Sequence, residues 1–406
     1  MSVQRVAMLS LHTSPLSQPG AGDSGGMNVY VHSLASALAR AGVGCDVLTR
    51  ADHAEQPPIM DVEPGFRVVH LDAGPRRPVP KESLPMLVDD LIASGRCYLA
   101  SAGEVDALHA HYWISGAVGH RLKHELDLPL VTTFHTLART KVSAGIDDDS
   151  TERSHIEGEV VACSDRIVAS TVDEVDELAA YNAVPDRIEV IPPGVDHALF
   201  SPGDARAARR RLGLPAGPLV LFVGRIQPLK GADVALRTLA ALPDDRTTLV
   251  IVGGPSGADG ERELASLRAL ADELGITDRV RWVEPQPHAA LVDWYRAADV
   301  CIVPSRTESF GLVALEAAAC GTPVVASEVG GLRSLVADGE AGFLVAGRAA
   351  ADYAAPVQLL LADERRAQRM GSAAVARSRQ YAWSMTAARL RRLYADVAAR
   401  ELVQCA

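Results

Sequence analysis

The chain has 406 residues, of which 48% are apolar and 22% charged, as in soluble globular proteins long enough for two domains with separate cores. The net charge of −11 argues against general nucleic-acid binding, because nothing in this balance would offset repulsion by the phosphates. The basic run RAARRRL at 206–212 is more typical of a solvated helix face than of a binding stripe.

The cysteines and the apolar runs bear on the cellular compartment. No CxxC pair and no metal-ligand spacing occurs among the six cysteines, which are Cys45, Cys97, Cys163, Cys301, Cys320 and Cys405. We interpret them as thiols of a reduced compartment rather than as a disulfide framework. The N-terminal apolar run ends before His12, too short for a signal peptide, and no run approaches a membrane span. We therefore expect a cytoplasmic protein.

The first half of the chain alternates strand-like runs with amphipathic helices. Strands are expected at 5–11, 45–50, 66–72, 106–112, 128–134, 165–171 and 187–191, and helices at 27–42, at 116–127 and from about 156. Such alternation with apolar strands predicts a parallel sheet covered on both faces. The Pro- and Gly-rich segment IPPGVDHALFSPGD at 191–204 interrupts the pattern. We expect an N-terminal Rossmann-like domain over 1–195.

The same alternation restarts after that segment. Strands are expected at 218–224, 247–252, 280–284, 300–305 and 322–327, with helices from 231 and at 261–274, 289–297 and 312–320. We predict a second doubly wound Rossmann-like domain over 196–380, and a C-terminal helix over 381–406 that packs back toward the N-terminal domain. In this α/β class, ligands bind at the carboxyl ends of the strands, which we expect to face each other across a cleft.

Two basic residues follow the first strand of the second domain. In GRIQPLKG at 224–231, Arg225 and Lys230 project from the loop that opens a helix, where two cations could neutralise a diphosphate leaving group. In isolation, such residues are more often solvated surface charges.

Two carboxylates flank a helix start in PSRTESFGLVALEA at 304–317. Glu308 falls in the loop after a strand and Glu316 about two turns into the helix. The helix N-terminus near Gly311 and Leu312 offers backbone N–H groups and a positive dipole end to an anion. Acids around an anion seat indicate recognition of a polyol, although an ordinary loop with two solvated acids fits this stretch alone.

Glycines also precede the first helix of the N-terminal domain. In GDSGGMNVYV at 22–31, Gly25 and Gly26 permit close backbone approach to an anion. The pattern is not GxGxxG, and no acid is placed to bind a ribose after the second strand, so dinucleotide binding is disfavoured. A simple tight turn is the alternative.

Polar residues end several N-terminal strands, namely His12, His111, Tyr112, His135 and Thr136. Gathered at one edge of a sheet, they favour a site. Without HExxH on one element, we predict no metal there and no cofactor. Lys81 and Arg153, considered alone, are surface charges.

Together these motifs carry a family resemblance. GRIQPLKG, the E-x7-E pair and IPPGVD resemble the retaining glycosyltransferases of family 4, which have the GT-B fold, over nearly the whole chain. The runs RVAMLSLHTSPLSQPGAGDSGGMNVYV, HAHYWISG, HTLARTK and VGGPSG are similar to those of the actinobacterial D-inositol-3-phosphate glycosyltransferases of mycothiol biosynthesis. Sucrose-phosphate synthases are more distantly similar.

The resemblance implies substrates and roles. It implies a UDP-N-acetylglucosamine donor, bound by the C-terminal domain, and an inositol phosphate acceptor, bound by the N-terminal domain. The donor-binding residues would be Gly25, Gly26, Arg225, Lys230, Glu308, Phe310, Gly311, Leu312 and Glu316, of which Arg225, Lys230 and Glu308, with His135, would be catalytic. The acceptor-binding residues would be Asn28, Lys81, Tyr112, Thr136 and Arg153.

The implied chemistry needs no metal. Without an enzymic nucleophile, retention suggests a front-face reaction in which the departing phosphate takes the proton of the acceptor hydroxyl. The alternatives are a paralogue of secondary metabolism with another anionic acceptor and a UDP- or GDP-sugar donor, a sucrose-phosphate-synthase-like enzyme, and a non-catalytic nucleotide-sugar sensor. A phosphorylase is disfavoured, because no lysine-linked cofactor motif is found. The sequence leaves open whether the protein forms a homodimer.

Overall fold

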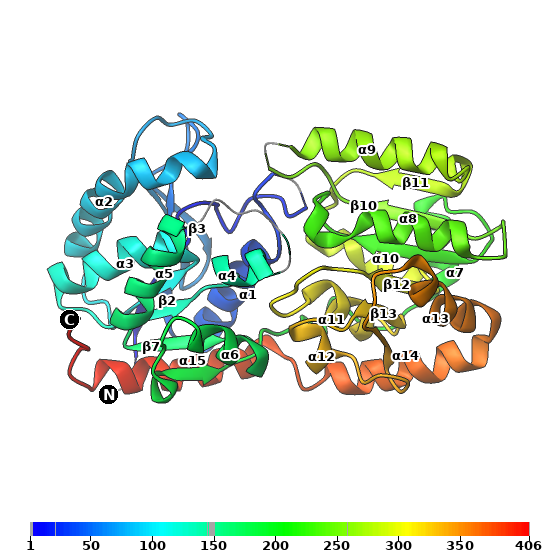
Figure 1. The fold of residues 1–406 in the computed structure, drawn as a ribbon. Helices are drawn as coiled ribbons and strands as arrows, with labels where there is room; N and C mark the ends of the chain where they lie inside the picture. The colour runs from blue at the N-terminus through cyan, green and yellow to red at the C-terminus, as the bar shows by residue number, and fades with distance from the viewer. Residues whose placement is uncertain (1–2, 21, 144, 146–150, 258, 406) are drawn as a thin grey trace. The chain divides into compact units, whose positions relative to one another are not determined.

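Figure 1 shows the computed structural model, which describes residues 3–20, 22–143, 145, 151–257 and 259–405. Residues 144 and 146–150, which fall between the predicted acceptor residues Thr136 and Arg153, therefore lie outside the described residues. The chain forms two compact units. Unit 1 comprises Met1–Ser17, Met27–Gly194 and Trp383–Ala406, and unit 2 comprises Gln18–Gly26 and Val195–Ala382.

Unit 1 is built on an eight-stranded sheet with the order β3-β4-β2-β1-β5-β6-β7-β8. All neighbouring strands are parallel except β3, which pairs antiparallel with β4 and which the sequence pattern did not reveal. The strand is exposed and lacks the apolar run of its neighbours. The strands are β1 (Arg5–Leu9), β2 (Gly44–Arg50), β3 (Ile59–Glu63), β4 (Phe66–Leu71), β5 (Ala107–His111), β6 (Leu130–Thr133), β7 (Arg166–Ala169) and β8 (Ile188–Val190).

Helices cover this sheet, as alternating apolar strands and amphipathic helices require. They are α1 (Gly26–Arg40), η1 (Lys81–Leu87), α2 (Val88–Ser101), α3 (Trp113–Leu126), α4 (Ala138–Ser143), α5 (Thr151–Cys163), α6 (Val172–Ala179), η2 (Pro185–Arg187) and α15 (Trp383–Ala398). Residues of α2 and α3, such as Leu91 and Leu122, share one buried cluster with Leu9 and Leu108 of the central strands.

The C-terminal helix α15 belongs to unit 1 and lies beside β7 and α6 in Figure 1. The Thr386 hydroxyl donates to the Pro192 carbonyl at 2.8 Å, and Arg166 of β7 pairs with Asp396 at 3.0 Å. Its Tyr394 hydroxyl lies 2.6 Å from His109 Nδ1. The apolar side of this helix is thus buried on the first sheet.

Unit 2 has a six-stranded, entirely parallel sheet with the order β11-β10-β9-β12-β13-β14. Its strands are β9 (Leu219–Val223), β10 (Thr248–Val252), β11 (Val280–Val283), β12 (Val300–Val303), β13 (Val324–Ser327) and β14 (Gly342–Val345). Successive strand residues face opposite sides. Leu219 and Leu221 enter one core cluster and Val220 and Phe222 another, so both faces are buried.

The helices that cover unit 2 are α7 (Ala205–Leu212), α8 (Ala232–Ala241), α9 (Gly260–Glu273), α10 (Leu291–Ala297), α11 (Leu312–Ala319), α12 (Gly331–Leu335), α13 (Ala350–Ala362) and α14 (Glu364–Ser378). Short 3-10 turns are η3 (Pro228–Lys230), η4 (Thr277–Arg279) and η5 (His288–Ala290). Two doubly wound, Rossmann-like sheets, parallel except for the edge strand β3, confirm the predicted α/β class. None of the helices among the described residues is long and apolar enough to cross a membrane.

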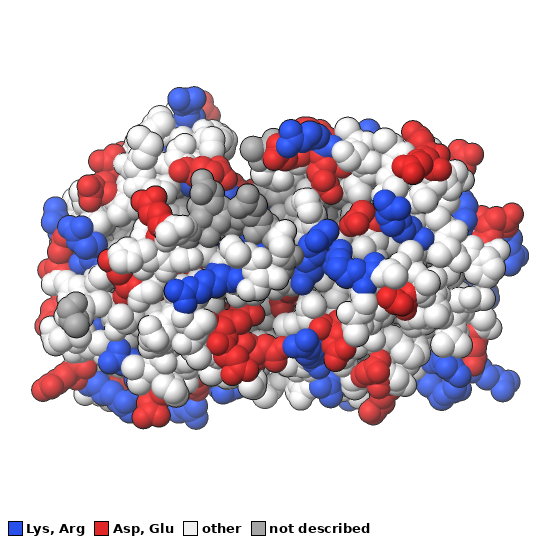
Figure 2. Space-filling view, viewed as in Figure 1, with Lys and Arg blue, Asp and Glu red and all other residues white. Residues whose placement is uncertain are grey.

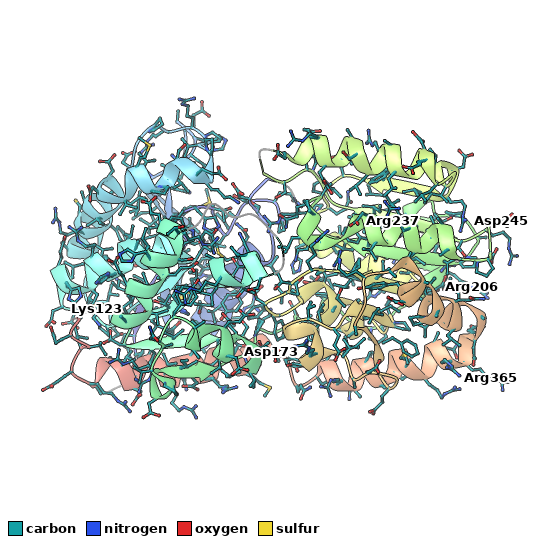
Figure 3. All side chains as sticks on the ribbon, in the orientation of Figure 1. Lys123, Asp173, Arg206, Arg237, Asp245 and Arg365 are labelled. Carbon is teal, nitrogen blue, oxygen red and sulfur yellow. A yellow bond between two sulfur atoms is a disulfide. The ribbon has the colours of Figure 1, made fainter. Side chains whose placement is uncertain are left out.

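The basic run at 206–212 forms α7, where arginines pair with local acids. Arg209 lies 2.8 Å from Asp299, and Arg211 lies 2.6 Å from Asp293. Arg206, labelled in Figure 3, is exposed on the same helix. On the face shown in Figure 2, basic and acidic side chains are interspersed over each unit. The run is therefore a paired helix face, as expected.

Two sequence-based expectations need correction. The segment 18–26, assigned to the N-terminal domain, belongs to unit 2 because its backbone bonds to 254–255: Gly254 N–H donates to Gly20 O at 2.8 Å and Gly22 N–H to Pro255 O at 3.1 Å. The cysteines are also not all free thiols, because Cys163 and Cys405 form a disulfide. Their separation of 242 positions in the sequence leaves no spacing signal.

Candidate functional site

Arg225 and Lys230 lie in the loop between β9 and α8. Ile226, fully buried between them, donates its N–H to Gly254 O at 2.8 Å and so fixes the loop to the next strand. Gly231, with φ of 72°, follows Lys230, and a Cβ there would lie 2.2 Å from the Pro304 carbonyl oxygen. Only glycine permits this approach, which brings the end of β12 to the basic loop.

The predicted lysine and the first predicted glutamate are in direct contact. Lys230 Nζ lies 2.7 Å from Glu308 Oε2, and the Ser305 hydroxyl donates to the same oxygen at 3.3 Å. The two charged side chains are 23% and 17% exposed. The pair is thus only partly screened by solvent and still open to a ligand.

Arg225 lies against the glycine loop of the same unit. Its Nη1 donates to Ser256 Oγ at 3.4 Å and to Asp23 O at 3.5 Å. A Cβ on Gly25 would lie 3.0 Å from Arg225 Nε, so the missing side chain lets backbone and guanidinium approach closely. Gly25 therefore meets Arg225 from within unit 2, and a Cβ on Gly26 would lie 3.7 Å from Leu312 of the same unit, although the sequence pattern assigned both glycines to the N-terminal domain.

The start of α11 lies beside the ion pair. Gly311, with φ of 102°, is the N-cap and offers no side chain to the first N–H groups of the helix. Gly331 N–H donates to Glu308 O at 2.9 Å, which fixes the loop that carries Glu308. Phe310, 5% exposed, packs edge-on against Tyr381. Leu312 begins the helix, so the predicted anion seat adjoins Lys230 and Glu308.

Glu316 is buried inside unit 2 and holds two side chains that the sequence analysis missed. His288 Nε2 lies 2.7 Å from Glu316 Oε1, and the Tyr295 hydroxyl donates to Oε2 at 2.7 Å. Burial of His288 opposes its charging, but the Glu316 carboxylate outweighs this effect and raises the pKa of the imidazole. His288 stands in the run VEPQPH, where no spacing rule linked it to Glu316.

In unit 1, three histidines gather at the ends of β5 and β6. His111 Nδ1 lies 3.0 Å from His135 Nε2, and His109 Nε2 lies 2.9 Å from Thr133 Oγ1. Burial lowers the pKa of His109 and of His135 to about 3, and lowers that of His111 well below its usual value. The rings are therefore neutral at physiological pH.

The backbone is unusual at two predicted site residues. Tyr112 has a φ of 76° and His135 a φ of 63°. Residues other than glycine rarely adopt this left-handed backbone region. Such conformations cluster at functional sites because surrounding contacts must hold them in place. The Tyr112 N–H donates to Thr133 O at 2.9 Å, which joins the two turns.

Arg153 of α5 gathers other predicted acceptor residues. Its guanidinium lies 5.0 Å from the centre of the Tyr112 ring and donates to the Thr136 carbonyl at 2.9 Å. Nε donates to Glu157 at 2.8 Å, with Arg153 6% and Glu157 0% exposed. Arg153 is thus a buried, paired cation rather than the surface charge it resembles in isolation.

Lys81 and Asn28 complete the acceptor set in different ways. Lys81 begins η1, whose Leu84 packs with Tyr112 in one cluster, and lies 3.9 Å from Glu82. Asn28 is 1% exposed and donates to Thr13 Oγ1 at 2.8 Å and to Ser14 O at 2.6 Å. Its amide group therefore fixes the loop after β1.

Other residues of the site were not anticipated. Glu157, Tyr30 and Tyr394 support the arginine and the histidines from helices far apart in sequence, as the T-shaped contact of Tyr30 with His135 shows. No motif spacing could reveal them. Among the described residues, the His, Cys, Asp and Glu side chains grouped closely enough to hold a metal ion lie outside this site.

Comparison with known proteins identifies the family. The model for glycosyl transferase 4-like domains matches residues 25–194, and that for glycosyl transferases group 1 matches residues 204–377. The chain belongs to the glycosyltransferases of the GT-B fold. This confirms the predicted family and the prediction that the chain is a transferase.

Relatives of this glycosyltransferase match over nearly its full length. It is 47% identical to the D-inositol 3-phosphate glycosyltransferase of Acidothermus cellulolyticus, over 98% of this chain and 91% of the relative. It is 48% identical to the enzyme of the same name from Xylanimonas cellulosilytica, over 98% of this chain and 97% of the relative. The predicted resemblance to the D-inositol 3-phosphate glycosyltransferases is thereby confirmed.

Solved structures agree on the fold. Sucrose-phosphate synthase from Thermosynechococcus elongatus superimposes with a TM-score of 0.91 at 32% identity, covering 97% of this chain and 99% of that one. Anabaena HepE in complex with UDP and glucose gives a TM-score of 0.79 at 20% identity, covering 97% and 100%. The second likeness shows the fold alone.

Proposed function

We propose that this glycosyltransferase moves N-acetylglucosamine from UDP-N-acetylglucosamine to 1D-myo-inositol 3-phosphate, with retention of the anomeric configuration, as in mycothiol biosynthesis. The observation that best supports donor binding is the ion pair of Lys230 and Glu308, 2.7 Å apart, at the start of α11. A cation and a helix N-terminus suit a diphosphate, and the neighbouring carboxylate suits a sugar hydroxyl.

In this proposal unit 2 binds the donor. Arg225, Lys230 and the N–H groups around Gly311 hold the diphosphate, and Glu308 accepts a hydrogen bond from the sugar. Glu316 accepts bonds from the ribose hydroxyls, while His288 and Tyr295 keep its carboxylate oriented. The positive groups stabilise the charge that develops on the leaving phosphate, so the chemistry needs no metal ion.

Unit 1 binds the acceptor in this proposal. Arg153 and Lys81 attract the phosphate of the inositol, with Tyr112 and Thr136 beside the guanidinium. The names of the relatives support this acceptor class. The neutral His135 lies against the donor sugar without adding a positive charge near the developing oxocarbenium ion.

The reaction then proceeds on one face of the sugar. The bond between the anomeric carbon and the β-phosphate oxygen breaks, and the acceptor hydroxyl oxygen bonds to the same carbon. The departing phosphate takes the hydroxyl proton. The protein contributes orientation and charge stabilisation rather than a nucleophile.

A product assay by mass spectrometry tests the proposal. Purified protein is incubated with EDTA, UDP-N-acetylglucosamine and, in separate tubes, inositol 3-phosphate, inositol or fructose 6-phosphate. A glycosylated inositol phosphate, with no product from free inositol, is the expected result. No product in any of these tubes would instead favour a paralogue with another acceptor or donor, and no turnover with all plausible acceptors would favour a nucleotide-sugar sensor.

A second candidate is synthesis of a sucrose-phosphate-like product. It is favoured by the TM-score of 0.91 and 32% identity to sucrose-phosphate synthase. The fructose 6-phosphate tube, repeated with UDP-glucose, separates it from the first candidate. A paralogue that uses another anionic acceptor, or GDP-sugars, would give product only in a wider screen.

A further inference from the structure

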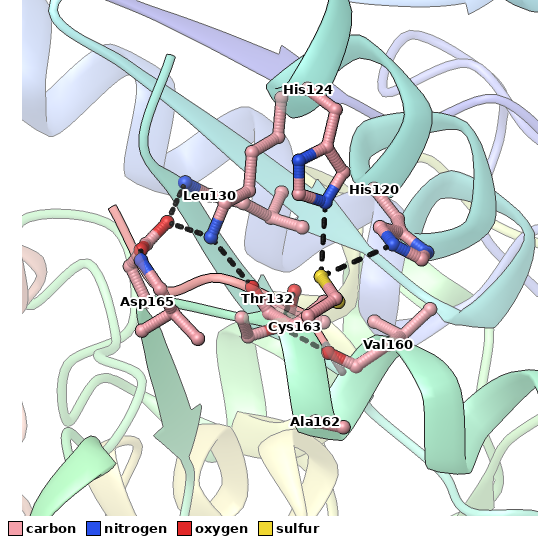
Figure 4. Close-up of a disulfide and its surroundings, with 12 residues drawn as sticks. His120, His124, Leu130, Thr132, Val160, Ala162, Cys163 and Asp165 are labelled. Carbon is pink, nitrogen blue, oxygen red and sulfur yellow. Dashed lines mark hydrogen bonds and ion pairs between the residues drawn. A yellow bond between two sulfur atoms is a disulfide. The ribbon is translucent and has the colours of Figure 1, made fainter. Parts of the chain in front are cut away.

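Two histidines and two cysteines meet in unit 1 at the C-terminal end of α3 (Figure 4). His120 and His124 lie one turn apart on α3 and therefore on the same face. Cys163 ends α5, and Cys405 comes from the segment after α15. The ligand atoms of all four side chains lie within 4.8 Å of one another.

The imidazoles converge on one sulfur. His124 Nε2 lies 2.9 Å from Cys405 Sγ, and His120 Nε2 lies 3.5 Å from the same atom. Cys163 Sγ is bonded to that sulfur in the disulfide. Two nitrogens and two sulfurs thus surround one point, and the two histidines have the H-x3-H spacing of zinc sites.

The position of Cys405 is fixed by a buried acid. Asp165 Oδ1 accepts from Val403 N–H at 2.7 Å, and Oδ2 accepts from Leu130 N–H at 2.7 Å and from Lys123 Nζ at 2.8 Å. Lys123, labelled in Figure 3, is fully buried and also donates to the Cys163 carbonyl. The same hydrogen-bond network therefore holds the end of α5, which carries Cys163, and the segment after α15, which carries Cys405.

The charge of the four side chains suits a divalent cation. Two thiolates would cancel the charge of a divalent ion, so the completed site would carry no net charge. That balance matters because Cys163 is only 2% exposed.

We propose that, when Cys163 and Cys405 are reduced, His120, His124 and the two cysteines bind one Zn²⁺ ion in a tetrahedral site. A dithiol or phosphine supplies the two electrons that convert the disulfide to two thiols. Each thiol then releases a proton as its thiolate binds the metal. Ideal Zn–N and Zn–S bonds of about 2.1 and 2.3 Å place the ligand atoms about 3.4–3.8 Å apart, inside the 4.8 Å limit of the cluster once reduction lets the two sulfurs separate.

The site is structural. His120 lies eight residues after Tyr112 at the start of α3, about 12 Å along the helix axis. The metal would fasten the segment after α15 to α3 and α5, which are elements of unit 1 that also carry Tyr112 and Arg153. This inference does not depend on the proposed substrates.

Metal content measured by mass spectrometry tests the proposal on the full chain. Protein reduced with a phosphine, with thiol titration to verify that the disulfide is open, is incubated with Zn²⁺ and desalted. About one zinc per chain is expected for the wild type, and at least a tenfold lower content for Cys405→Ser and His124→Ala. Cys97→Ser and His155→Ala, at exposed positions outside the cluster, serve as matched controls and should keep the zinc.

Cobalt substitution provides a second readout. Co²⁺ in the wild-type site should give thiolate charge-transfer and tetrahedral d–d bands that Cys405→Ser lacks. Because Cys405→Ser replaces one atom in the segment after α15, outside the described helices and strands, this variant should fold normally, as circular dichroism can verify. Reduced wild type that binds no more zinc than Cys405→Ser would overturn the proposal and leave the cysteine pair as a disulfide alone.

Discussion

The Lys230 ammonium lies 2.7 Å from the Glu308 carboxylate. A cation from the loop after β9 and an acid from the loop after β12 therefore form one ion pair. Lys230→Ala should lower kcat about 10²–10³-fold with a smaller change in the KM for donor, because the charge on the leaving diphosphate grows in the transition state. Steady-state kinetics at several donor concentrations measure this split.

The same contact predicts how two variants combine. The loss of activity in Lys230→Ala/Glu308→Ala should be smaller than the product of the single losses, since each single variant already disrupts the pair. Arg206→Ala, on the exposed face of α7, is the control and should keep full activity. Unchanged turnover in Lys230→Ala would contradict the donor assignment.

Arg153→Ala should weaken binding of the phosphorylated acceptor and also destabilise the protein. The acceptor effect follows from the lost positive charge, and the stability effect from Glu157, which is 0% exposed and would lose its partner. Breaking a buried pair costs about 3–5 kcal/mol. Acceptor KM and slow donor hydrolysis, with thermal unfolding in parallel, measure the two effects.

A double variant separates these effects. Arg153→Met/Glu157→Gln should recover part of the lost stability, because it removes the buried uncompensated charge, but it should not recover acceptor binding. If the double variant restored acceptor KM as well, Arg153 would act on the fold and not on the acceptor phosphate.

The buried histidines predict acid sensitivity. The pKa of His109 and of His135 is about 3 in the folded chain, below the ordinary 6.5, so the unfolded chain binds more protons between these values. Stability should therefore fall as the pH drops from about 6.5 toward 3, by about 1.4 kcal/mol per pH unit for each histidine. His111 adds to this trend.

One buried acid opposes the histidines over part of this range. Burial raises the pKa of Glu174 to about 7, so it binds its proton more tightly in the folded chain between 4.5 and 7. Urea unfolding at a series of pH values measures the sum, and His109→Gln should flatten the slope. A wild-type curve that rises toward acid pH would refute the prediction.

The His288–Glu316 pair has the opposite pH signature. Because the pKa of His288 is raised in the folded chain, the pair should stabilise the protein fully below the ordinary value of 6.5. This contribution should disappear as the pH rises through the folded pKa. The stability difference between wild type and Glu316→Gln, followed from pH 5 to 9, should therefore shrink with rising pH, and a constant difference would count against a charged His288.

Much of the donor region could be predicted because its motifs are local. Arg225, Lys230 and Glu308 end strands of one parallel sheet, and strand topology alone brings such residues together. The partners of Glu316 were missed, since His288 reaches it from η5 and Tyr295 from α10. Their pairing depends on how α10 and η5 pack, which no periodicity encodes.

In unit 1 the residues were predicted but their environment was not. Lys81 and Arg153 resemble surface charges in sequence, yet Arg153 is buried by Glu157 and the Tyr112 ring. The disulfide and the histidines around it were also missed, because Cys405 joins them through the fold of α15 rather than through nearby sequence. Contacts across hundreds of residues are tertiary information.

Each unit combines segments that lie far apart in the sequence, which has a consequence for folding during synthesis on the ribosome. Unit 1 includes α15, so one face of its sheet and its His109–Tyr394 contact stay incomplete until this helix emerges. Unit 2 needs 18–26, which the ribosome delivers more than two hundred residues before residues 254–255, to which this segment bonds. A fragment cut at residue 195 would therefore yield neither unit whole, and the nascent chain must keep its early β-strands from aggregating until translation ends.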